Sequence, residues 1–312
     1  MRVLHAPEEL RPGDRQVCLA IGFFDGVHLG HQKIVRETIG IALQQNDLAV
    51  VLTFDQHPST VVAPGRIPQL IYPLGRKIQT IGALRPDALL LLRFDEALSR
   101  QTGEEFIRYL ARTLGPLRVI CVGERFVFGH RRGGNIGLLQ SLGAELHFAA
   151  RGVTAVQWEG NIVSSTRIRE AIRLGNLSHA TRMLGREYSL CGVVQSGDGL
   201  GRQIGFPTAN LNTTGLVLPP TGVYSVRAGV DGCSYPAVLN IGYRPTLGHA
   251  EPQLRVECHL LDFAGDLYGK EIDLFFVEQL REEMKFPSLE ALRKQIMADI
   301  ATARRLFPPT GT

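Results

Sequence analysis

The chain has 312 residues and a formal net charge of +4; 44% of its residues are hydrophobic and 21% are charged. This composition excludes a disordered chain, and the length is sufficient for two domains of ordinary size. Charged residues near the N-terminus exclude the apolar stretch of a secretory signal, and the apolar runs are too short to span a bilayer. We therefore expect a cytoplasmic protein with no membrane partner.

Cysteine and arginine usage limits the possible ligands. The five cysteines form no Cys-x-x-Cys pair, and four lie within apolar runs, which argues against a disulfide framework or a zinc site. Most basic residues are arginines, which suit phosphate, although ordinary surface charge explains this usage equally well. No concentrated basic run or nucleic-acid-binding motif is present, so we expect no nucleic-acid partner.

From residue 17 to about 150, short β-rich runs alternate with amphipathic helical segments. Continuous apolar strands separated by helices predict a parallel sheet that is covered on both faces. One of the helices is expected to start at a capping box, Thr102-Gly-Glu-Glu105. The expected strands are 17–21, 48–54, 88–92, 118–122 and 145–149.

A glycine-rich segment with two histidines, Gly22-Phe-Phe-Asp-Gly-Val-His-Leu-Gly-His31, follows the first of these strands. A turn between a strand and a helix N-terminus offers backbone N–H groups and the positive end of the helix dipole to an anion. His28 and His31 add two further donors, so the segment indicates a phosphate site used for chemistry at phosphorus. The helix that follows is expected to bury one face, formed by Ile34, Val35, Thr38, Ile39, Ala42 and Leu43.

Three more segments are expected at the same edge of the sheet. Asp55 and His57 follow the second strand, the glycine- and arginine-rich segment 123–134 follows the fourth, and Val163-Ser-Ser-Thr-Arg-Ile-Arg169 opens a helix. Each has a purely structural interpretation as a turn or a helix cap. Because ligands of parallel sheets bind at the carboxyl ends of the strands, the combination favours a phosphate site. The chain has neither a Walker A loop nor a G-x-G-x-x-G motif.

The sequence pattern changes near residue 184. Turn-forming residues then recur at intervals of roughly 8 to 12 residues between β-rich runs, which predicts a small antiparallel barrel or sandwich. A helix over 289–306 with Ser288 as its N-cap is expected to end the chain. The expected strands are 188–194, 223–230, 237–241, 254–261 and 272–280.

A glycine-rich loop in this half precedes two oxygen-bearing side chains, Thr208 and Asn210. Their spacing places both on one side of an extended strand, and such oxygens suit Mg²⁺ bound beside nucleotide phosphates. Glu257 shares a strand face with Arg255 and His259. Its spacing alone favours a solvated strand residue over a catalytic base.

The motif G-x-F-D-G-x-H-x-G-H, together with S-S-T-R-I-R, resembles the adenylyltransferase half of prokaryotic bifunctional riboflavin kinase/FAD synthetases, a Rossmann-like nucleotidyltransferase. The resemblance implies catalytic roles for His28, His31 and Arg167, and it implies that the flavin lies near Asp55, His57 and Arg125. The ATP-binding residues that it implies are Phe24, Asp25, Gly26, Gly30, Ser165, Thr166 and Arg169.

Two positions depart from that family's pattern. Gln56 replaces the first proline of F-x-P-H-P, and Arg125 stands where Asp or Asn is usual. Since position 125 is expected near the flavin or the nucleotide, the arginine adds a cation there.

The second half resembles the flavokinase barrel through G-R-x-I-G-F-P-T-A-N, G-V-Y, N-I-G-x-R-P-T, V-E-x-H-L-L-D-F and R-x-E-x-K-F. The resemblance implies that Glu257 is the catalytic base, which reverses the preference from spacing, and that Thr208 and Asn210 bind Mg²⁺ and nucleotide. The other residues that it implies are Gly199, Gly201, Arg202, Gly205 and Pro207 for ATP, and Arg281, Glu283 and Phe286 for the flavin.

Together these patterns predict an adenylyltransferase domain over 1–184 and a kinase domain over 185–312. We expect ATP-dependent phosphorylation of riboflavin to FMN, followed by adenylylation of FMN to FAD with release of pyrophosphate. The alternative is a flavin- or nucleotide-responsive binding protein that has lost one activity. Because a binding protein needs no base, the presence of Glu257 with both histidines disfavours that alternative.

Overall fold

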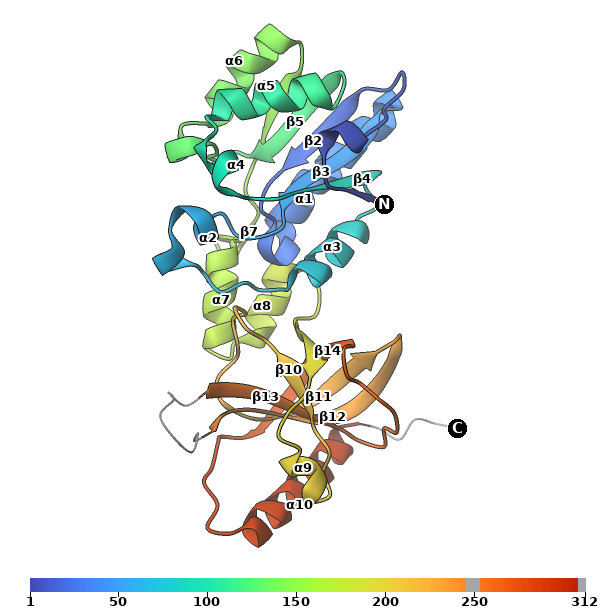
Figure 1. Cartoon of the computed structure of the whole chain (residues 1–312), viewed down its shortest axis with the longest axis vertical. Coiled ribbons are helices and arrows are strands. Elements are labelled where there is room, and N and C mark those ends of the chain that lie inside the picture. The colour runs from blue at the N-terminus through green and yellow to red at the C-terminus, as the bar shows by residue number, and fades with distance from the viewer. Residues whose placement is uncertain (245–252, 308–312) are drawn as a thin grey trace. The chain divides into compact units, whose positions relative to one another are not determined.

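The computed structural model describes residues 1–244 and 253–307. Residue contacts divide the chain into two compact units, one formed by 1–168 with 183–185 and the other by 169–182 with 186–312. Figure 1 shows the elements of both units. Pro245 and Thr246, the end of the N-I-G-x-R-P-T motif, lie outside the described residues.

The first unit contains a six-stranded sheet in the order β1-β4-β3-β2-β5-β6, and every pair of neighbours is parallel. This confirms the predicted parallel α/β sheet, and all its strands therefore end at one edge. The strands are β1 (Arg2–Leu4), β2 (Val17–Ile21), β3 (Leu48–Phe54), β4 (Ala88–Leu92), β5 (Leu117–Gly123) and β6 (Ala149–Val153).

Helices cover both faces of this sheet. Alternate residues of β2 face opposite sides, so Leu19 packs in a cluster with Leu110 of α5, and Ala20 packs in another with Val35 of α1. The main helices are α1 (Leu29–Gln45), α3 (Leu74–Gly82), α5 (Gly103–Thr113) and α6 (Ile136–Leu146). The short elements are η1 (Pro7–Glu9), η2 (Asp25–Val27), α2 (Ser59–Val62), η3 (Pro64–Arg66), α4 (Glu96–Arg100), η4 (His130–Arg132) and the hairpin of β7 (Gln157–Trp158) and β8 (Asn161–Ile162).

The expected start of α5 is confirmed. The Thr102 side chain accepts a hydrogen bond from the Glu105 backbone N–H, and Glu105 accepts one from the Thr102 backbone in return. Two further helices, α7 (Ser165–Arg173) and α8 (Leu177–Leu184), lie in the part of the chain where the two units are divided.

Two strand predictions for the first unit need correction. The strand expected at 145–149 is wrong, because α6 continues to Leu146 and ends at His147 in the left-handed conformation, so β6 begins only at Ala149. The strand β1 was missed: it has three residues, too few to show a periodic pattern, and it pairs with β4.

The buried face of α1 is narrower than expected. Ile34, Val35, Thr38 and Ala42 are buried, but Leu43 is 77% exposed. Each helical step turns the side chain by about 100°, so Leu43 falls outside the stripe that Ala42 continues.

The second unit contains a closed barrel with the strand order β10-β13-β12-β11-β14-β9, all of it antiparallel. The predicted small antiparallel barrel is confirmed. Its elements are β9 (Ser189–Gln195), α9 (Leu200–Gln203), β10 (Ala209–Asn212), β11 (Gly222–Val230), β12 (Cys233–Arg244), β13 (Gln253–Leu260) and β14 (Glu271–Arg281).

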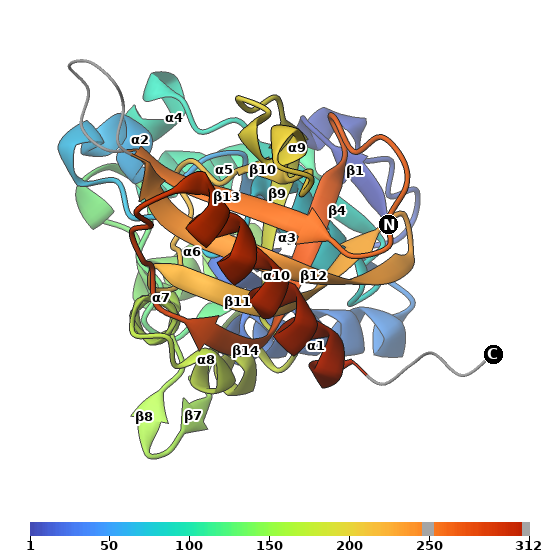
Figure 2. The same cartoon turned by 90° about the horizontal axis from the view of Figure 1, so that it is seen from below.

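The final helix, α10 (Leu289–Leu306), lies across the barrel strands, as Figure 2 shows. Its predicted N-cap is confirmed, because the Ser288 side chain accepts a hydrogen bond from the Ala291 backbone N–H. Ala303 of α10 is buried in a cluster with Val223 and Val238 of the barrel wall. The helix thereby closes one side of the barrel.

The two leucines Leu52 and Leu43 test this account of the core. Leu52 in β3 is fully buried, so Leu52→Ala should lower the free energy of unfolding of the first unit by about 2–5 kcal/mol. Leu43→Ala is the control and should change it by less than about 0.5 kcal/mol. Urea unfolding followed by the fluorescence of Trp158, the single tryptophan, reports on this unit. Equal losses in the two variants would contradict the assignment of the buried face.

Candidate active sites

The turn after β2 has an unusual backbone. Phe24 and Val27 have φ values of 55° and 41°, and Gly26 has φ 74°. A Cβ on Gly26 would also lie 2.7 Å from Ile71 Cδ1, so only glycine fits there. The buried Asp25 carboxylate accepts a hydrogen bond from the Ile71 backbone N–H at 3.0 Å. The turn is therefore held in one conformation by the segment that leads into α3.

The two histidines of the turn lie face to face. Their rings stack with centroids 3.6 Å apart and an interplanar angle of 19°. His28 is the N-cap of α1, and its Nδ1 accepts a hydrogen bond from the His31 backbone N–H at 3.4 Å. Since Nδ1 accepts, the neutral ring carries its proton on Nε2. A Cβ on Gly30 would lie 3.1 Å from His28 Cε1, which explains the glycine between the two histidines.

The start of α7 meets this turn. Ser164 caps the helix by accepting a hydrogen bond from the Arg167 backbone N–H at 3.3 Å, whereas the Ser165 hydroxyl donates to the Asp25 carbonyl at 3.0 Å. Ser164 is thus the helix cap, and Ser165 joins the start of α7 to the histidine turn. Thr166 is exposed in the same helical turn.

Two predicted arginines of α7 are placed differently from the serines. The Arg167 guanidinium donates to the carbonyl oxygens of Asn161 and Ile162, each at 3.1 Å, so it is held by β8. Arg169 lies two residues further along α7 and falls in the second contact unit.

The segment after β3 lies beside the histidine turn. The His57 ring meets the Phe23 ring edge to face, with centroids 4.7 Å apart, and its Nδ1 accepts a hydrogen bond from the Ser59 backbone N–H. Asp55 accepts a hydrogen bond from the Phe94 backbone N–H at 2.9 Å. Gln56, the departure from the family pattern, donates to the Phe94 carbonyl at 2.7 Å.

The other departure, Arg125, is exposed directly after β5. It therefore lies at the carboxyl end of its strand, where sequence analysis expected the segment 123–134.

Lys77 of α3 is a charged residue of this region that sequence analysis missed. Its side chain is buried, and its Nζ donates to the Phe54 carbonyl at 2.7 Å. Burial lowers the pKa of Lys77 to about 8, and the nearby Asp25 and Asp55 oppose that shift. The sequence signal that could have revealed Lys77 is a lysine on the buried face of an amphipathic helix. This signal is weak because α3 is short and because Lys77 lies in no motif.

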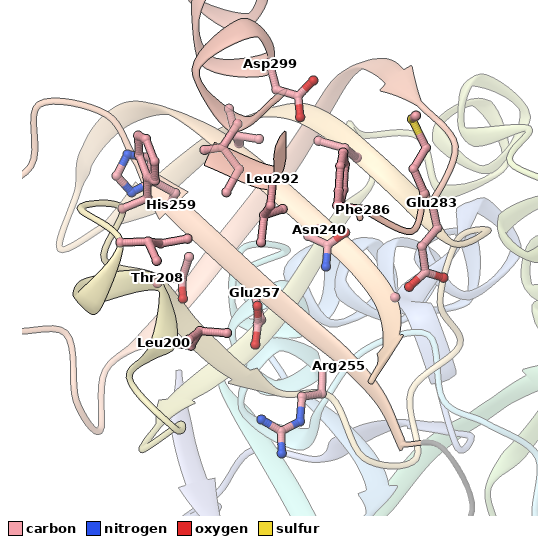
Figure 3. Close-up of a pocket in the computed structure, with 18 of the residues that line it drawn as sticks. Leu200, Thr208, Asn240, Arg255, Glu257, His259, Glu283, Phe286, Leu292 and Asp299 are labelled. Carbon is pink, nitrogen blue, oxygen red and sulfur yellow. The ribbon is translucent and has the colours of Figure 1, made fainter. Parts of the chain in front are cut away.

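The barrel contains a cavity of about 290 Å³. Strand register pairs Glu257 of β13 with Asn210 of β10 on one side and with Asn240 of β12 on the other. Residues paired in this way project from the same face of a sheet, and all three line the cavity. Figure 3 shows Glu257 and Asn240 at its wall, with Thr208 nearby. Asn240 is the first residue of the N-I-G-x-R-P-T motif, but sequence analysis assigned it no role, because its place beside Glu257 follows from the strand register.

The glycine-rich loop packs closely against the predicted metal ligands. A Cβ on Gly201 would lie 3.1 Å from Thr208 Oγ1, and a Cβ on Gly197 would collide with the Asn210 amide. The absence of side chains at these two positions therefore lets the loop pack against Thr208 and Asn210. Two neutral oxygens with a carboxylate beside them suit a hard cation that completes its shell with phosphate oxygens and water. In the described part of the chain, no cluster of three or more His, Cys, Asp or Glu side chains could hold a metal ion.

Two contacts from β13 hold this loop. Arg255 forms an ion pair with Asp198 at 2.8 Å, and His259 Nδ1 lies 2.7 Å from the Pro207 carbonyl. A carbonyl can only accept, so this histidine nitrogen carries the proton. Arg255 and His259 lie on either side of Glu257 in β13, so this strand holds the loop at two points.

The predicted flavin residues Arg281, Glu283 and Phe286 line the same cavity. Arg281 pairs with the buried Asp299 of α10 at 3.0 Å, and its guanidinium lies 5.6 Å from the centroid of the Phe286 ring. Glu283 accepts a hydrogen bond from the Tyr243 backbone N–H at 2.9 Å. The contribution of α10 to the cavity was not anticipated.

The predicted ATP-binding residues of the loop divide into two groups. Gly199 and Gly201 line the cavity, while Arg202, Gly205 and Pro207 are exposed and are not part of its lining.

No helix among the described residues has the length and apolar character needed to cross a bilayer.

Comparison with known proteins gives matches to both units. A family model described as FAD synthetase matches residues 11–167, and one described as riboflavin kinase matches residues 184–307. A bifunctional riboflavin kinase/FMN adenylyltransferase of Pseudomonas fluorescens is 38% identical over 100% of this chain and 99% of its own length. The protein of that description from Escherichia coli K12 is 36% identical, with 98% of each chain covered.

A crystal structure described as a macrolide-efflux protein from Streptococcus pneumoniae superposes with a TM-score of 0.79. The two chains are 27% identical, and 97% of this chain and 98% of that chain are covered. Both family models and relatives that match over nearly their whole length therefore agree: the chain belongs to the bifunctional riboflavin kinase/FMN adenylyltransferase family.

Proposed function

We propose that the two reactions of this ATP-dependent enzyme run at two separate sites. Riboflavin is phosphorylated to FMN in the barrel cavity, and FMN is adenylylated to FAD at the carboxyl edge of the parallel sheet. The observation that carries the kinase assignment is the row of Asn210, Glu257 and Asn240 across three paired strands of the cavity wall.

We place the division between an adenylyltransferase domain, 1–184, and a kinase domain, 185–312. The gap between the two matched ranges, which end at 167 and begin at 184, supports this boundary.

In the kinase step, Glu257 accepts the proton of the ribityl 5′-hydroxyl as that oxygen attacks the γ-phosphorus of ATP and ADP leaves. The backbone N–H groups around Gly199 and Gly201 bind the phosphates, and Arg202, Gly205 and Pro207 shape the outer part of the loop. The reaction depends mainly on this positioning and on neutralising the phosphate charge.

We propose that Thr208 and Asn210 hold Mg²⁺ together with the phosphates of ATP, since their oxygens are of the type that this ion prefers. When bound, the ion supplies charge neutralisation on the phosphates. Arg281, Glu283 and Phe286 orient the flavin ring system in the inner part of the cavity.

In the second step, a phosphate oxygen of FMN attacks the α-phosphorus of ATP, and pyrophosphate leaves. This oxygen is already anionic, so no general base is needed. His28 and His31 stabilise the charge that develops on the transferring and leaving phosphates. Arg167 joins them when it exchanges its β8 carbonyl partners for a phosphate, to which its guanidinium binds more strongly.

The remaining predicted residues support this second site. We propose that Phe24 and Asp25 hold the turn, and that Gly26 and Gly30 let the backbone approach ATP. Ser165 and Thr166 contact its phosphates, and Asp55, His57 and Arg125 lie near the flavin. We also propose a cytoplasmic location, which suits an ATP-dependent enzyme whose five cysteines are free.

Replacing the proposed base separates the two activities. Glu257→Gln should lower FMN formation by about 10²–10⁴-fold because the amide cannot accept the proton. FAD formation from supplied FMN should be unchanged. Chromatographic separation of FMN and FAD measures both. Glu278→Gln, an exposed acid of β14 that does not line the cavity, is the matched control. Loss of both activities in Glu257→Gln would contradict the assignment to two sites.

Replacing the histidine pair should have the reverse effect. In the double variant His28→Ala/His31→Ala we expect riboflavin and ATP to give FMN that accumulates, because the phosphate donors of the second step are lost. Its rate of FAD formation should fall by at least about 10²-fold. The exposed His5→Ala serves as control. A near-normal rate of FAD formation in the double variant would show that the pair is only structural.

A further inference from the structure

Lys77 has an environment that the fold alone does not explain. Its side chain is buried beneath the carboxyl ends of β2 and β3, with 4% of its surface exposed. Lysine is almost never fully buried unless it is paired, because its charge loses hydration. A methionine would fill a similar volume without that penalty, but it would leave the Phe54 carbonyl without the donor that Lys77 supplies.

The ammonium group faces three oxygens that belong to the two strand ends. Nζ donates to the Phe54 carbonyl at 2.7 Å and lies 3.4 Å from the Phe23 carbonyl and 3.5 Å from Thr53 Oγ1. The Thr53 hydroxyl itself donates to the Phe23 carbonyl at 2.9 Å. The three hydrogens of an ammonium match these three acceptors. Lys77 thus joins the end of β3 to the first residues of the histidine turn.

The same ammonium group also contacts the aromatic pair above it. Nζ lies 4.3 Å from the centroid of the Phe23 ring, which is cation–π distance, and that ring meets His57 edge to face. Asp25 of the histidine turn and Asp55, which directly follows β3, are the charged groups that act on Lys77.

We propose that Lys77 is a positioning residue for FMN adenylylation: its ammonium group fixes the ends of β2 and β3, and with them the Phe23–His57 pair and the histidine turn. This inference rests on the proposed placement of adenylylation at this edge of the sheet. Lys77 contacts no substrate in this account, and it acts through the backbone and the rings that it holds.

A pH dependence follows from the three contacts. Burial lowers the pKa of Lys77 from 10.5 to about 8. Above that pH the amine is neutral and has only two N–H donors for the three oxygens. It also loses the positive charge that attracts the Phe23 ring and the two carboxylates. The phosphates of both substrates lose their last proton near about pH 6, so they do not titrate in this range. FAD formation should therefore fall as the pH rises through about 8.

Stability should change in the opposite direction. Between about pH 8 and 10.5 the unfolded chain keeps the Lys77 proton that the folded chain has released. The unfolded state then binds more protons, so the contribution of this group to the free energy of unfolding rises with pH. Falling activity with rising stability separates positioning from a purely structural role.

The test measures FAD formation from supplied FMN and ATP between about pH 7 and 9.5 in the full-length protein, across the expected pKa. For Lys77→Met we expect a kcat about 10–100-fold lower, a size typical of misplaced catalytic groups, and a nearly unchanged KM for ATP. Lys77→Arg should retain more activity and should lose the decline near pH 8, because a guanidinium keeps its proton. Its profile decides the question even if Lys77→Met folds poorly.

Lys33→Met is the matched control, since Lys33 is the other lysine of the first unit and its Nζ bonds Thr154 at the surface. It should behave as the unchanged protein, and riboflavin phosphorylation should be unaffected in all three variants.

Wild-type rates of FAD formation in Lys77→Met, or a decline near pH 8 that persists in Lys77→Arg, would overturn the inference. The double variant His28→Ala/His31→Ala is measured in parallel. If it also forms FAD at the normal rate, adenylylation occurs elsewhere and the proposed site itself is wrong. If it is inactive while Lys77→Met is fully active, only the role of Lys77 is wrong.

Discussion

Hydrogen bonding between neighbouring strands determines which side chains stand together at both candidate sites. In the barrel, the antiparallel register aligns Glu257 with an asparagine on each side. A shift of one residue would turn the carboxylate to the other face and out of the cavity. In the sheet, the parallel pairing brings the ends of β2 and β3 to one edge, so two segments that are about 30 residues apart in sequence meet there.

The loops at the sheet edge depend in turn on side chains that satisfy their backbone. The Phe23 carbonyl accepts from the Thr53 hydroxyl, the Phe54 carbonyl accepts from Lys77, and the Asp25 carbonyl accepts from Ser165. Each donor comes from another element, so the conformation of the histidine turn is set by tertiary contacts. This is consistent with a site for phosphoryl chemistry, where catalysis depends on prepositioned donors.

Sequence patterns predicted much of this structure and missed specific parts for physical reasons. The parallel sheet and the barrel followed from long periodic segments, whereas β1 was too short to show a period. The expected strand at 145–149 failed because helix α6 extends into it. Glu257 and Asn240 both lie in motifs, but the alignment of Asn240 with Glu257 depends on strand pairing. The contacts of Lys77 depend on its burial on a short helix. Those relations arise only when the chain has folded.

In the proposed function, one chain carries two separate sites, each of which performs one of the two reactions. Mixing Glu257→Gln with the double variant His28→Ala/His31→Ala, with riboflavin, ATP and Mg²⁺ supplied, tests it most directly. The mixture should form FAD from riboflavin, because FMN made by one protein is adenylylated by the other. Neither variant alone should form FAD from riboflavin. FAD formed from riboflavin by either variant alone, or none from a mixture whose members keep their separate partial reactions, would contradict it.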